Sequence, residues 1–408
     1  MKVIVAIDSF KGCLTSVEAN LAATEGVHAR IPNAEVVQIP VSDGGEGWLV
    51  AFQRVLGGRV IEHNVQDPLM RPIKAQYLIK GETAVIEIAK ASGLTLLTPE
   101  ERNPLETTSY GTGQLVMDAI RRGCKHIVLG LGGSATSDCG IGMLRAIIDS
   151  YTEGRNCKRS RLDNQTLTNF DAIIKDGTWN EIRSLNNVHI TIATDVTNPL
   201  CGKNGAAYVF APQKGATPEM VFTLESRAKQ FAEASAQHFG YDRQNVPGAG
   251  AAGGLGYAFL QYLNADCRSG IDLLLETVDF DNLLKGTDLV ITGEGSADRQ
   301  TLMGKLPYGI LQRAKAHHVP VILIAGHINN HQELLDAGFS QVECINTWNS
   351  KNNPSLLDNK VMSFETSGLS MEEAMKPETA KKNISKTIVS LFSDKYYGKQ
   401  QGLRAIHR

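Results

Sequence analysis

The chain has 408 residues, of which 42% are hydrophobic and 21% are charged. This ordinary globular composition excludes wholesale disorder, a collagen-like repeat and a coiled-coil rod. The 41 Lys and Arg against 43 Asp and Glu give a net charge of -2. No overall basic field is therefore present to hold nucleic acid or an anionic membrane, although a local basic pocket for a small anion is not excluded.

Cysteine usage and the N-terminus indicate a cellular compartment. The seven cysteines are scattered without a C-x-x-C pair, which favours reduced thiols over disulfides or a zinc site. The apolar run at 3–7 is too short for a signal peptide core, and no run reaches the roughly 18 apolar residues of a membrane span. We therefore expect a cytoplasmic protein with no membrane and no nucleic-acid partner.

The first elements alternate between strand and helix. Residues 3–7 form a continuous apolar run, which is typical of a strand buried on both faces, and Ser16 can cap the helix that follows. A second strand is predicted at 36–39, followed by a helix at 48–56 that ends at two glycines.

The middle of the chain has a mixed character. Alternation typical of β-strands runs from 59 to 90, and we interpret the polar, uneven stretch 150–187 as a peripheral insertion. Further strands are predicted at 127–131 and 188–194, and helices at 220–239 and 255–263.

The strand-and-helix pattern then returns, with strands predicted at 288–292, 319–325 and 342–346. Two early and three late strands predict an α/β protein of two domains, in which a mixed α/β domain interrupts a doubly wound parallel sheet. We expect one discontinuous domain at 1–58 plus 286–408 and the inserted domain at 59–285.

Three loops follow strands of the predicted parallel sheet: 8–12, 42–47 and 293–298. Ligands of such sheets bind beyond the carboxyl ends of the strands, so we expect these loops to share one cleft. In the first loop, Lys11 can neutralise a moving phosphoryl group, and Asp8 can hold Mg²⁺ or accept a proton. The alternative is that Asp8 caps the turn and Lys11 is a solvated charge.

The loop 42–47 has three glycines in four positions, flanked by Asp43 and Glu46, and lies at a helix N-terminus. Glycines allow close backbone approach, and helix N-termini attract anions, so we favour a ligand site here over a tight turn capped by Asp43.

Two segments of the middle region add further polar groups at strand ends. The amides and hydroxyls of 130–138 suit phosphate oxygens, although no Walker-type P-loop is present. Asp195 follows a strand and precedes the turn at Asn198, whereas Lys214 is interpreted as a surface lysine of a loop.

The motifs 8–11, 43–47, 107–113, 132–136, 195–200, 212–216, 247–256, 293–295 and 304–305 follow one another along the chain. Together they resemble the type I glycerate kinases, the family of bacterial glycerate 2-kinases. The resemblance implies a flavodoxin-like domain and an inserted domain similar to restriction endonucleases. It also implies ATP and Mg²⁺ as cofactors and D-glycerate as the acceptor, giving 2-phosphoglycerate in the cleft between the two domains.

On this resemblance, Lys11 would neutralise charge on the transferred phosphoryl group. Asp43 and Asp195 would be the acceptor-side base and the Mg²⁺ ligand, and the sequence leaves open which does which. Groups expected to bind phosphate or substrate are Ser9, Ser42, Gly44, Gly45, Gly132, Gly133, Ser134, Thr136, Asn198, Gly293, Glu294, Gly295 and Asp298.

The sequence departs from the family pattern at two places. Cys139 stands where the family has glycine, and Ser296 stands where it favours arginine. These departures leave two alternatives: a non-catalytic homologue that senses glycerate or nucleotide, and a kinase of another small hydroxy acid. The retained acids and Lys11 count against a sensor. The hydroxyl that is phosphorylated and the oligomeric state stay open.

Overall fold

The computed structural model describes residues 1–42, 44–45, 47–152, 173–174, 187–346, 361–362 and 370–392. The chain forms two compact units, the first from 1–42 with 274–408 and the second from 43–273. The boundaries expected from the sequence, at 58/59 and 285/286, stay a prediction. Most of the predicted insertion at 150–187, together with Asp43 and Glu46, lies outside the described residues.

The first unit contains a sheet in the order β11-β10-β9-β1-β2, and β12 pairs with β10. The strands are β1 (Lys2–Ile7), β2 (Glu35–Gln38), β9 (Leu289–Ala297), β10 (Val321–Asn329), β11 (Gln341–Cys344) and β12 (Val361–Met362). All pairs are parallel except β10 with β12. Counted along this sheet, the order is the 2-1-3-4-5 of flavodoxin-like folds, which confirms the predicted doubly wound sheet of two early and three late strands.

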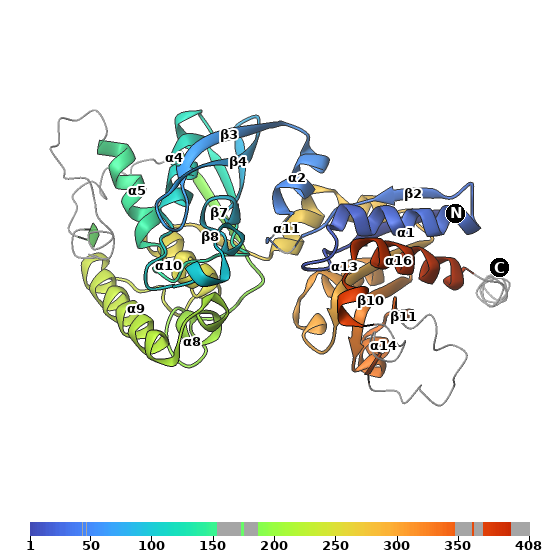
Figure 1. The fold of residues 1–408 in the computed structure, drawn as a ribbon. Coiled ribbons are helices and arrows are strands. Elements are labelled where there is room, and N and C mark those ends of the chain that lie inside the picture. Colours follow the sequence, from blue (N-terminus) through green and yellow to red (C-terminus); the bar gives the residue numbers. More distant parts are fainter. Residues whose placement is uncertain are drawn as a thin grey trace. The chain divides into compact units, whose positions relative to one another are not determined.

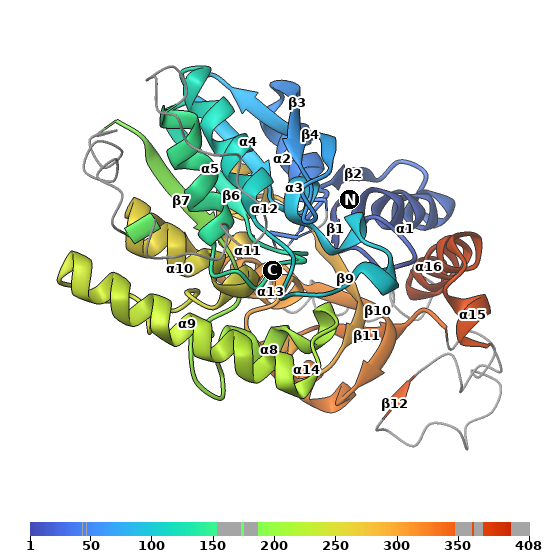
Figure 2. The ribbon, with the colours of Figure 1, turned by 60° about the vertical axis from the view of Figure 1, so that its left-hand side comes forward.

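Apolar β1 residues are fully buried because helices cover the sheet of the first unit. These helices are α1 (Ser16–Arg30), α12 (Phe280–Leu284), α13 (Leu306–Ala316), α14 (His331–Ala337), α15 (Met371–Ala374) and α16 (Pro377–Leu391), with a 3₁₀ turn, η5, at Thr301–Met303. Helices α1 and α16 lie side by side in both views (Figures 1 and 2). Gly26 permits this approach, since a Cβ there would lie 2.6 Å from the carbonyl oxygen of Ser385.

The start of α1 differs from the sequence-based expectation. Thr15, not Ser16, caps the helix, through a reciprocal capping box with Glu18. The buried Ser16 hydroxyl instead donates to the carbonyl oxygen of Ile7 at 2.5 Å and accepts from the Val41 N–H at 2.9 Å. Ser16 therefore ties the ends of the first two strands together, a role that only the folded structure reveals.

The second unit contains a mixed sheet in the order β3-β4-β5-β6-β7-β8. Its strands are β3 (Arg59–Gln66), β4 (Pro72–Lys80), β5 (Thr83–Glu87), β6 (His126–Gly130), β7 (His189–Ala193) and β8 (Asp266–Arg268). The first three are antiparallel, and β5 to β8 are parallel. This sheet confirms the expected mixed α/β character of the middle of the chain.

The helices of the second unit are α2 (Trp48–Leu56), α3 (Ala89–Ser92), α4 (Tyr110–Arg121), α5 (Ile141–Thr152), α8 (Ala206–Phe210), α9 (Pro218–Phe239) and α10 (Ala251–Leu263). Helix α11 (Gly270–Thr277) contains the chain position, 273/274, at which the second unit ends. Short 3₁₀ turns are η1 (Leu94–Leu96), η2 (Pro99–Glu101) and η4 (Pro212–Lys214). Among the residues described, no helix is long and apolar enough to cross a membrane.

Candidate active site

In the first unit, the order of strands reverses between β1 and β9. The loop after β1 and the end of β9 meet at this point, because the Asp8 N–H donates to the carbonyl oxygen of Gly293 at 2.9 Å. A Cβ at Gly295 would lie 3.7 Å from the Phe10 Cα and 3.8 Å from the backbone nitrogen of Lys11. The two loops predicted to carry ligands in this unit, 8–12 and 293–298, therefore lie against each other.

The side chains of the loop after β1 have different roles in its geometry. Oδ1 of Asp8 accepts from the N–H of the next residue, Ser9, at 2.7 Å. Asp8 and Ser9 are half-buried, whereas Lys11 is exposed. This contact does not decide between the two interpretations of Asp8, and the exposed Lys11 side chain can reach a ligand in solution.

Glu294 is a buried carboxylate on β9, with 8% of its surface exposed. The Thr301 hydroxyl donates to it at 2.6 Å, and the Lys305 ammonium lies 3.5 Å away. Burial raises the pKa of Glu294, against the lowering effects of Thr301 and Lys305. A buried carboxylate with a shifted pKa is typical of a functional site.

Asp298 holds the turn η5 in place. Its Oδ1 accepts from the Gln300 N–H at 2.7 Å, and its own N–H donates to the Thr301 hydroxyl at 3.0 Å. Asp298 therefore orders the residue that hydrogen-bonds Glu294, which is an indirect role. The exposed Arg299, close to the place where the family favours arginine, forms a two-point ion pair with Glu333 at 2.6 and 2.7 Å.

Sequence reasoning missed polar groups at the ends of the next two strands. His327 on β10 is in register with Ser296 on β9. Asn346, buried just beyond β11, donates to the carbonyl oxygen of Gly326 at 2.9 Å and accepts from Asn383 at 3.1 Å. The available signals were His327, two residues after the predicted strand 319–325, and Asn346, the last residue of the predicted strand 342–346.

In the second unit, the predicted glycines gather at the carboxyl ends of β6 and β7. The Gly132 N–H donates to the carbonyl oxygen of Gly44 at 2.9 Å. A Cβ at Gly44 would lie 2.9 Å from the Ala193 oxygen, and one at Gly132 would lie 2.3 Å from the Gly45 Cα. Glycine is therefore required at these positions because two backbones meet there. Ser42, which is buried, belongs to the first unit.

The loop 131–138, which follows β6, is held by backbone and side-chain hydrogen bonds. The Leu94 N–H donates to the Gly133 oxygen at 2.9 Å, and the Ala135 N–H donates to the Ser92 oxygen at 2.8 Å. The Thr107 hydroxyl donates to the Ala135 oxygen at 3.1 Å. Gly133 is exposed, whereas the polar residues Ser134, Thr136 and Ser137 are buried.

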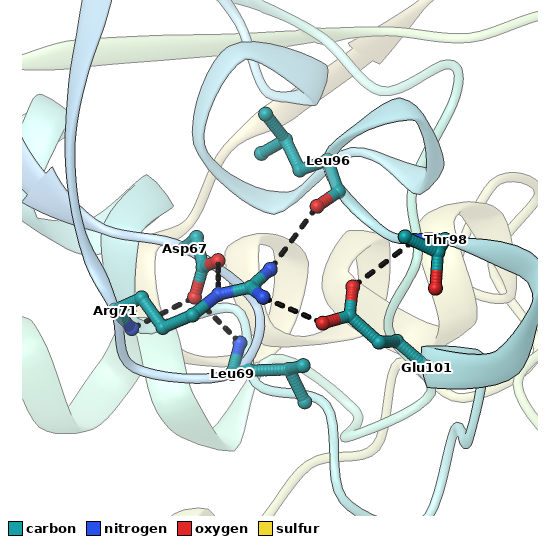
Figure 3. Close-up of polar contacts among 6 residues, drawn as sticks. All are labelled: Asp67, Leu69, Arg71, Leu96, Thr98 and Glu101. Atoms are coloured by element: carbon teal, nitrogen blue, oxygen red, sulfur yellow. Dashed lines mark hydrogen bonds and ion pairs between the residues drawn. The ribbon is translucent and has the colours of Figure 1, made fainter.

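A polar cluster at the turn between β3 and β4 anchors the segment that supports this loop (Figure 3). The Arg71 guanidinium donates to Asp67 at 2.5 Å, to Glu101 at 2.6 Å and to the carbonyl oxygen of Leu96 at 3.2 Å. Glu101 in turn accepts from the Thr98 N–H at 3.0 Å. These bonds fix η1 and η2, and Leu94 at the start of η1 contacts the 131–138 loop through Gly133.

Lys214 corrects a sequence-based interpretation. It was expected at the surface, but only 3% of it is exposed. Its ammonium donates to the Ser134 hydroxyl at 2.8 Å and to the Thr136 carbonyl oxygen at 2.6 Å. Desolvation lowers the pKa of Lys214 to about 7, although the charge of Asp138 acts in the opposite direction.

Asp138 and Cys139 end this loop. The Asp138 carboxylate accepts from the N–H and hydroxyl of Ser109 at 2.8 Å each, and from the Gly140 and Gly142 N–H groups at 3.0 and 3.1 Å. It therefore joins the starts of α4 and α5. Cys139 is buried and has a left-handed φ of 54°, a conformation that favours the glycine usual in the family.

Asp195, directly after β7, accepts from the N–H of Gly270 at the start of α11 at 3.1 Å. Asn198 donates from its amide to the Asn204 oxygen at 2.8 Å and orders its own turn. In the described part of the chain, no three His, Cys, Asp or Glu side chains are grouped as in a metal centre.

Comparison with known proteins identifies the class. Residues 3–365 match the model of the glycerate kinase family. The chain is 42% identical over 349 residues to a glycerate kinase of Bacillus subtilis (strain 168), spanning 84% of this chain and 90% of that protein. It is 38% identical over 361 residues to the glycerate 2-kinase of Escherichia coli (strain K12), spanning 85% and 92% of the two chains.

A solved structure agrees with these matches. A chain assigned as glycerate kinase 2 from Salmonella typhimurium LT2 has a TM-score of 0.72 and 33% identity, with 98% of this chain and 99% of that chain covered. These matches define an enzyme of the phosphotransferase class. The chain belongs to the glycerate kinase family, which confirms the resemblance seen in its motifs.

Proposed function

We propose that this chain transfers the terminal phosphoryl group of ATP to D-glycerate and releases 2-phosphoglycerate. The relatives named glycerate kinase and glycerate 2-kinase support the choice of acceptor. The observation that carries the reaction type is the exposed Lys11 ammonium at the reversal of strand order, beside the end of β9. Ligands of open α/β sheets bind at that place.

In this proposal, Lys11 stabilises the charge that develops on the transferred group, as a fixed cation does in other phosphoryl transfers. The backbone at Gly295, where a Cβ would meet no atom nearer than the Phe10 Cα at 3.7 Å, leaves room for phosphate oxygens near Lys11. Glu294 keeps the Lys305 ammonium close to the same strand end. These groups bind and orient; none of them needs to form a covalent intermediate.

Mg²⁺ is the metal that the proposal requires. It prefers oxygen ligands and is held in kinases by one or two carboxylates together with substrate phosphates, so Asp195 and Asp43 are chemically suitable ligands. When bound, Mg²⁺ would neutralise phosphate charge. Either carboxylate is suited to accept the proton of the attacking hydroxyl, and the assignment between the two is part of the test.

The proposal is tested by comparing Lys11→Ala with Lys382→Ala, an exposed lysine on α16. Loss of the cation at the reaction centre should lower kcat by roughly 10³-fold, whereas the control should keep wild-type turnover. Matched thermal unfolding would show that both variants fold. An unchanged kcat in Lys11→Ala would remove Lys11 from the mechanism. A comparison of Asp43→Asn with Asp195→Asn across Mg²⁺ concentrations would separate the ligand from the base.

A further inference from the structure

Lys214 is buried, and its ammonium has no anionic partner among the residues that the structure describes. In the described part of the second unit, its hydrogen-bond acceptors are the Ser134 hydroxyl and the Thr136 carbonyl oxygen, which are neutral. An ammonium has three N–H donors, so this pair leaves one of them unused. Buried lysines are almost always paired with a charge, because desolvating an ammonium is costly.

The carboxylate whose charge acts on Lys214 does not fill this gap. Asp138 influences the charge of Lys214 but forms no ion pair with it within the described ranges, and its oxygens accept from Ser109, Gly140 and Gly142. Asp138 is therefore committed to the helix starts. Within the described ranges, the Lys214 ammonium is therefore not matched by a negative charge.

A second, independent observation lies on the same loop. The hydroxyl oxygens of Thr136 and Ser137 are buried, with residue exposures of 0% and 8%, and have no hydrogen-bond partner among the residues that the structure describes. A buried hydroxyl left without a partner costs about 1–3 kcal/mol. Unused hydroxyls on this loop, and the ammonium of Lys214 that is bonded to it from η4, are the groups that an oxyanion would satisfy.

Another cation belongs to the adjoining segment. A Cβ at Gly215, which has a φ of 94°, would lie 2.2 Å from the carbonyl oxygen of Arg102, so the two backbones touch. The Nε of Arg102 is buried and lacks a hydrogen-bond partner in the described chain. Arg102 follows Glu101, which the Arg71 cluster holds in place (Figure 3). Two cationic residues thus occur on segments fixed against each other.

We propose that Lys214 is a positioning residue that prepares the 131–138 loop to bind an oxyanion, acting through the Ser134 hydroxyl. Ser134 accepts from Lys214, which leaves its own O–H to donate to a carboxylate or phosphate that approaches at the exposed Gly133. This inference rests on the proposed function, since the acceptor carboxylate and the phosphates of ATP are the two sources of such an anion.

Binding at this loop is coupled to a proton. Burial lowers the pKa of Lys214 to about 7, so the ammonium is mostly neutral at pH 8 and an anion must draw a proton onto it. Among the described residues, the charged side chains on the segments that contact η4 are Asp138 and Arg102. Helix α8, which also packs against η4, has Tyr208 as its titratable group. Affinity should therefore fall as the pH rises above 7.

The test is calorimetric titration of the full chain with D-glycerate and, separately, with sulfate. Sulfate replaces phosphate as the probe because it does not change its protonation state between pH 6 and 8. Measurement in buffers of different ionisation enthalpy gives the number of protons taken up. We expect about 0.9 protons per anion at pH 8 and about 0.1 at pH 6 for the anion that uses this loop. Proton uptake on binding D-glycerate would identify the acceptor carboxylate as the anion at this loop, and proton uptake on binding sulfate would identify a phosphate of ATP.

Variants separate this role from simple structural support. Lys214→Met should weaken binding of that anion about 10- to 100-fold at pH 6 and abolish proton uptake, and Ser134→Ala should also weaken it. Lys80→Met, an exposed lysine at the end of β4, should change neither quantity. The wild-type measurement remains decisive if Lys214→Met does not fold.

Binding of both anions without proton uptake would overturn the proposal for Lys214, as would glycerate-dependent turnover in a protein that binds neither anion at this loop. In each of these cases the proposed kinase function stands. Proton-coupled anion binding without turnover would instead refute the kinase function and leave the role of Lys214 intact.

Discussion

Replacing Lys214 by methionine should stabilise the protein at acidic pH. A fall of the pKa from 10.5 to about 7 means that the folded protein holds the ammonium at a cost of about 5 kcal/mol. Methionine fills similar space without charge, but leaves the Thr136 carbonyl oxygen without its donor, at about 1–3 kcal/mol. We therefore expect Lys214→Met to be more stable than wild type by about 2–4 kcal/mol at pH 6.

The sign of this effect depends on pH. Below pH 7, Lys214 is protonated in both states, so the full cost of the buried charge is present. Between about pH 7 and 10.5 the unfolded chain binds the extra proton, and wild-type stability rises by about 1.4 kcal/mol per pH unit relative to the variant. By pH 10 the advantage of Lys214→Met should have disappeared.

Urea unfolding at pH 6, 8 and 10, followed by tryptophan fluorescence, gives the comparison, because one of the three tryptophans, Trp48, is fully buried in the same unit as Lys214. Lys80→Met serves as the control and should differ from wild type by the same small amount at each pH. A free-energy difference between wild type and Lys214→Met that does not change from pH 6 to pH 10 would refute the buried-charge argument.

Three further predictions concern other positions. Glu294→Gln should raise the melting temperature at pH 8 but not at pH 4. Burial raises the pKa of Glu294, so its negative charge destabilises the fold only at a pH above that pKa. An equal change of the melting temperature at both pH values would contradict this. Gly26→Ala should lower the free energy of unfolding by about 1–3 kcal/mol, because the added Cβ would lie 2.6 Å from the carbonyl oxygen of Ser385. An unchanged denaturation midpoint would show that α1 and α16 separate easily. Cys139→Gly should change the free energy of unfolding by no more than about 1 kcal/mol. The relief of the strain of a left-handed φ of 54° offsets the lost burial of the thiol. Equilibrium unfolding measures this difference.

The sheet of the first unit was predictable because its signals are local. The apolar runs at 3–7 and 288–292 match β1 and β9, and the wide separation of early and late strands correctly indicated an interrupted sheet. Strand order then follows from the rules of parallel sheets. The adjacency of the loops 8–12 and 293–298 is a consequence of that order.

Other features depend on contacts that are distant in sequence. Lys214 is buried because it bonds Ser134 and Thr136, which lie 80 and 78 positions away, and no local pattern distinguishes it from a surface lysine. The cap at Thr15 was missed because Ser16 has the same hydroxyl chemistry and its true partners, Ile7 and Val41, meet only in the fold. Gly44 was recognised as special, but its packing against the end of β7 was not visible in the sequence.

The most direct test of the central claim is an ADP-release assay on the purified full chain with Mg-ATP and D-glycerate, combined with phosphorus NMR of the product. We predict turnover that depends on glycerate and a product signal from a phosphate on the 2-hydroxyl. A signal from the 3-phosphate would contradict the proposed product. Absence of turnover, with either ligand still raising the melting temperature, would contradict the kinase assignment and favour a binding protein.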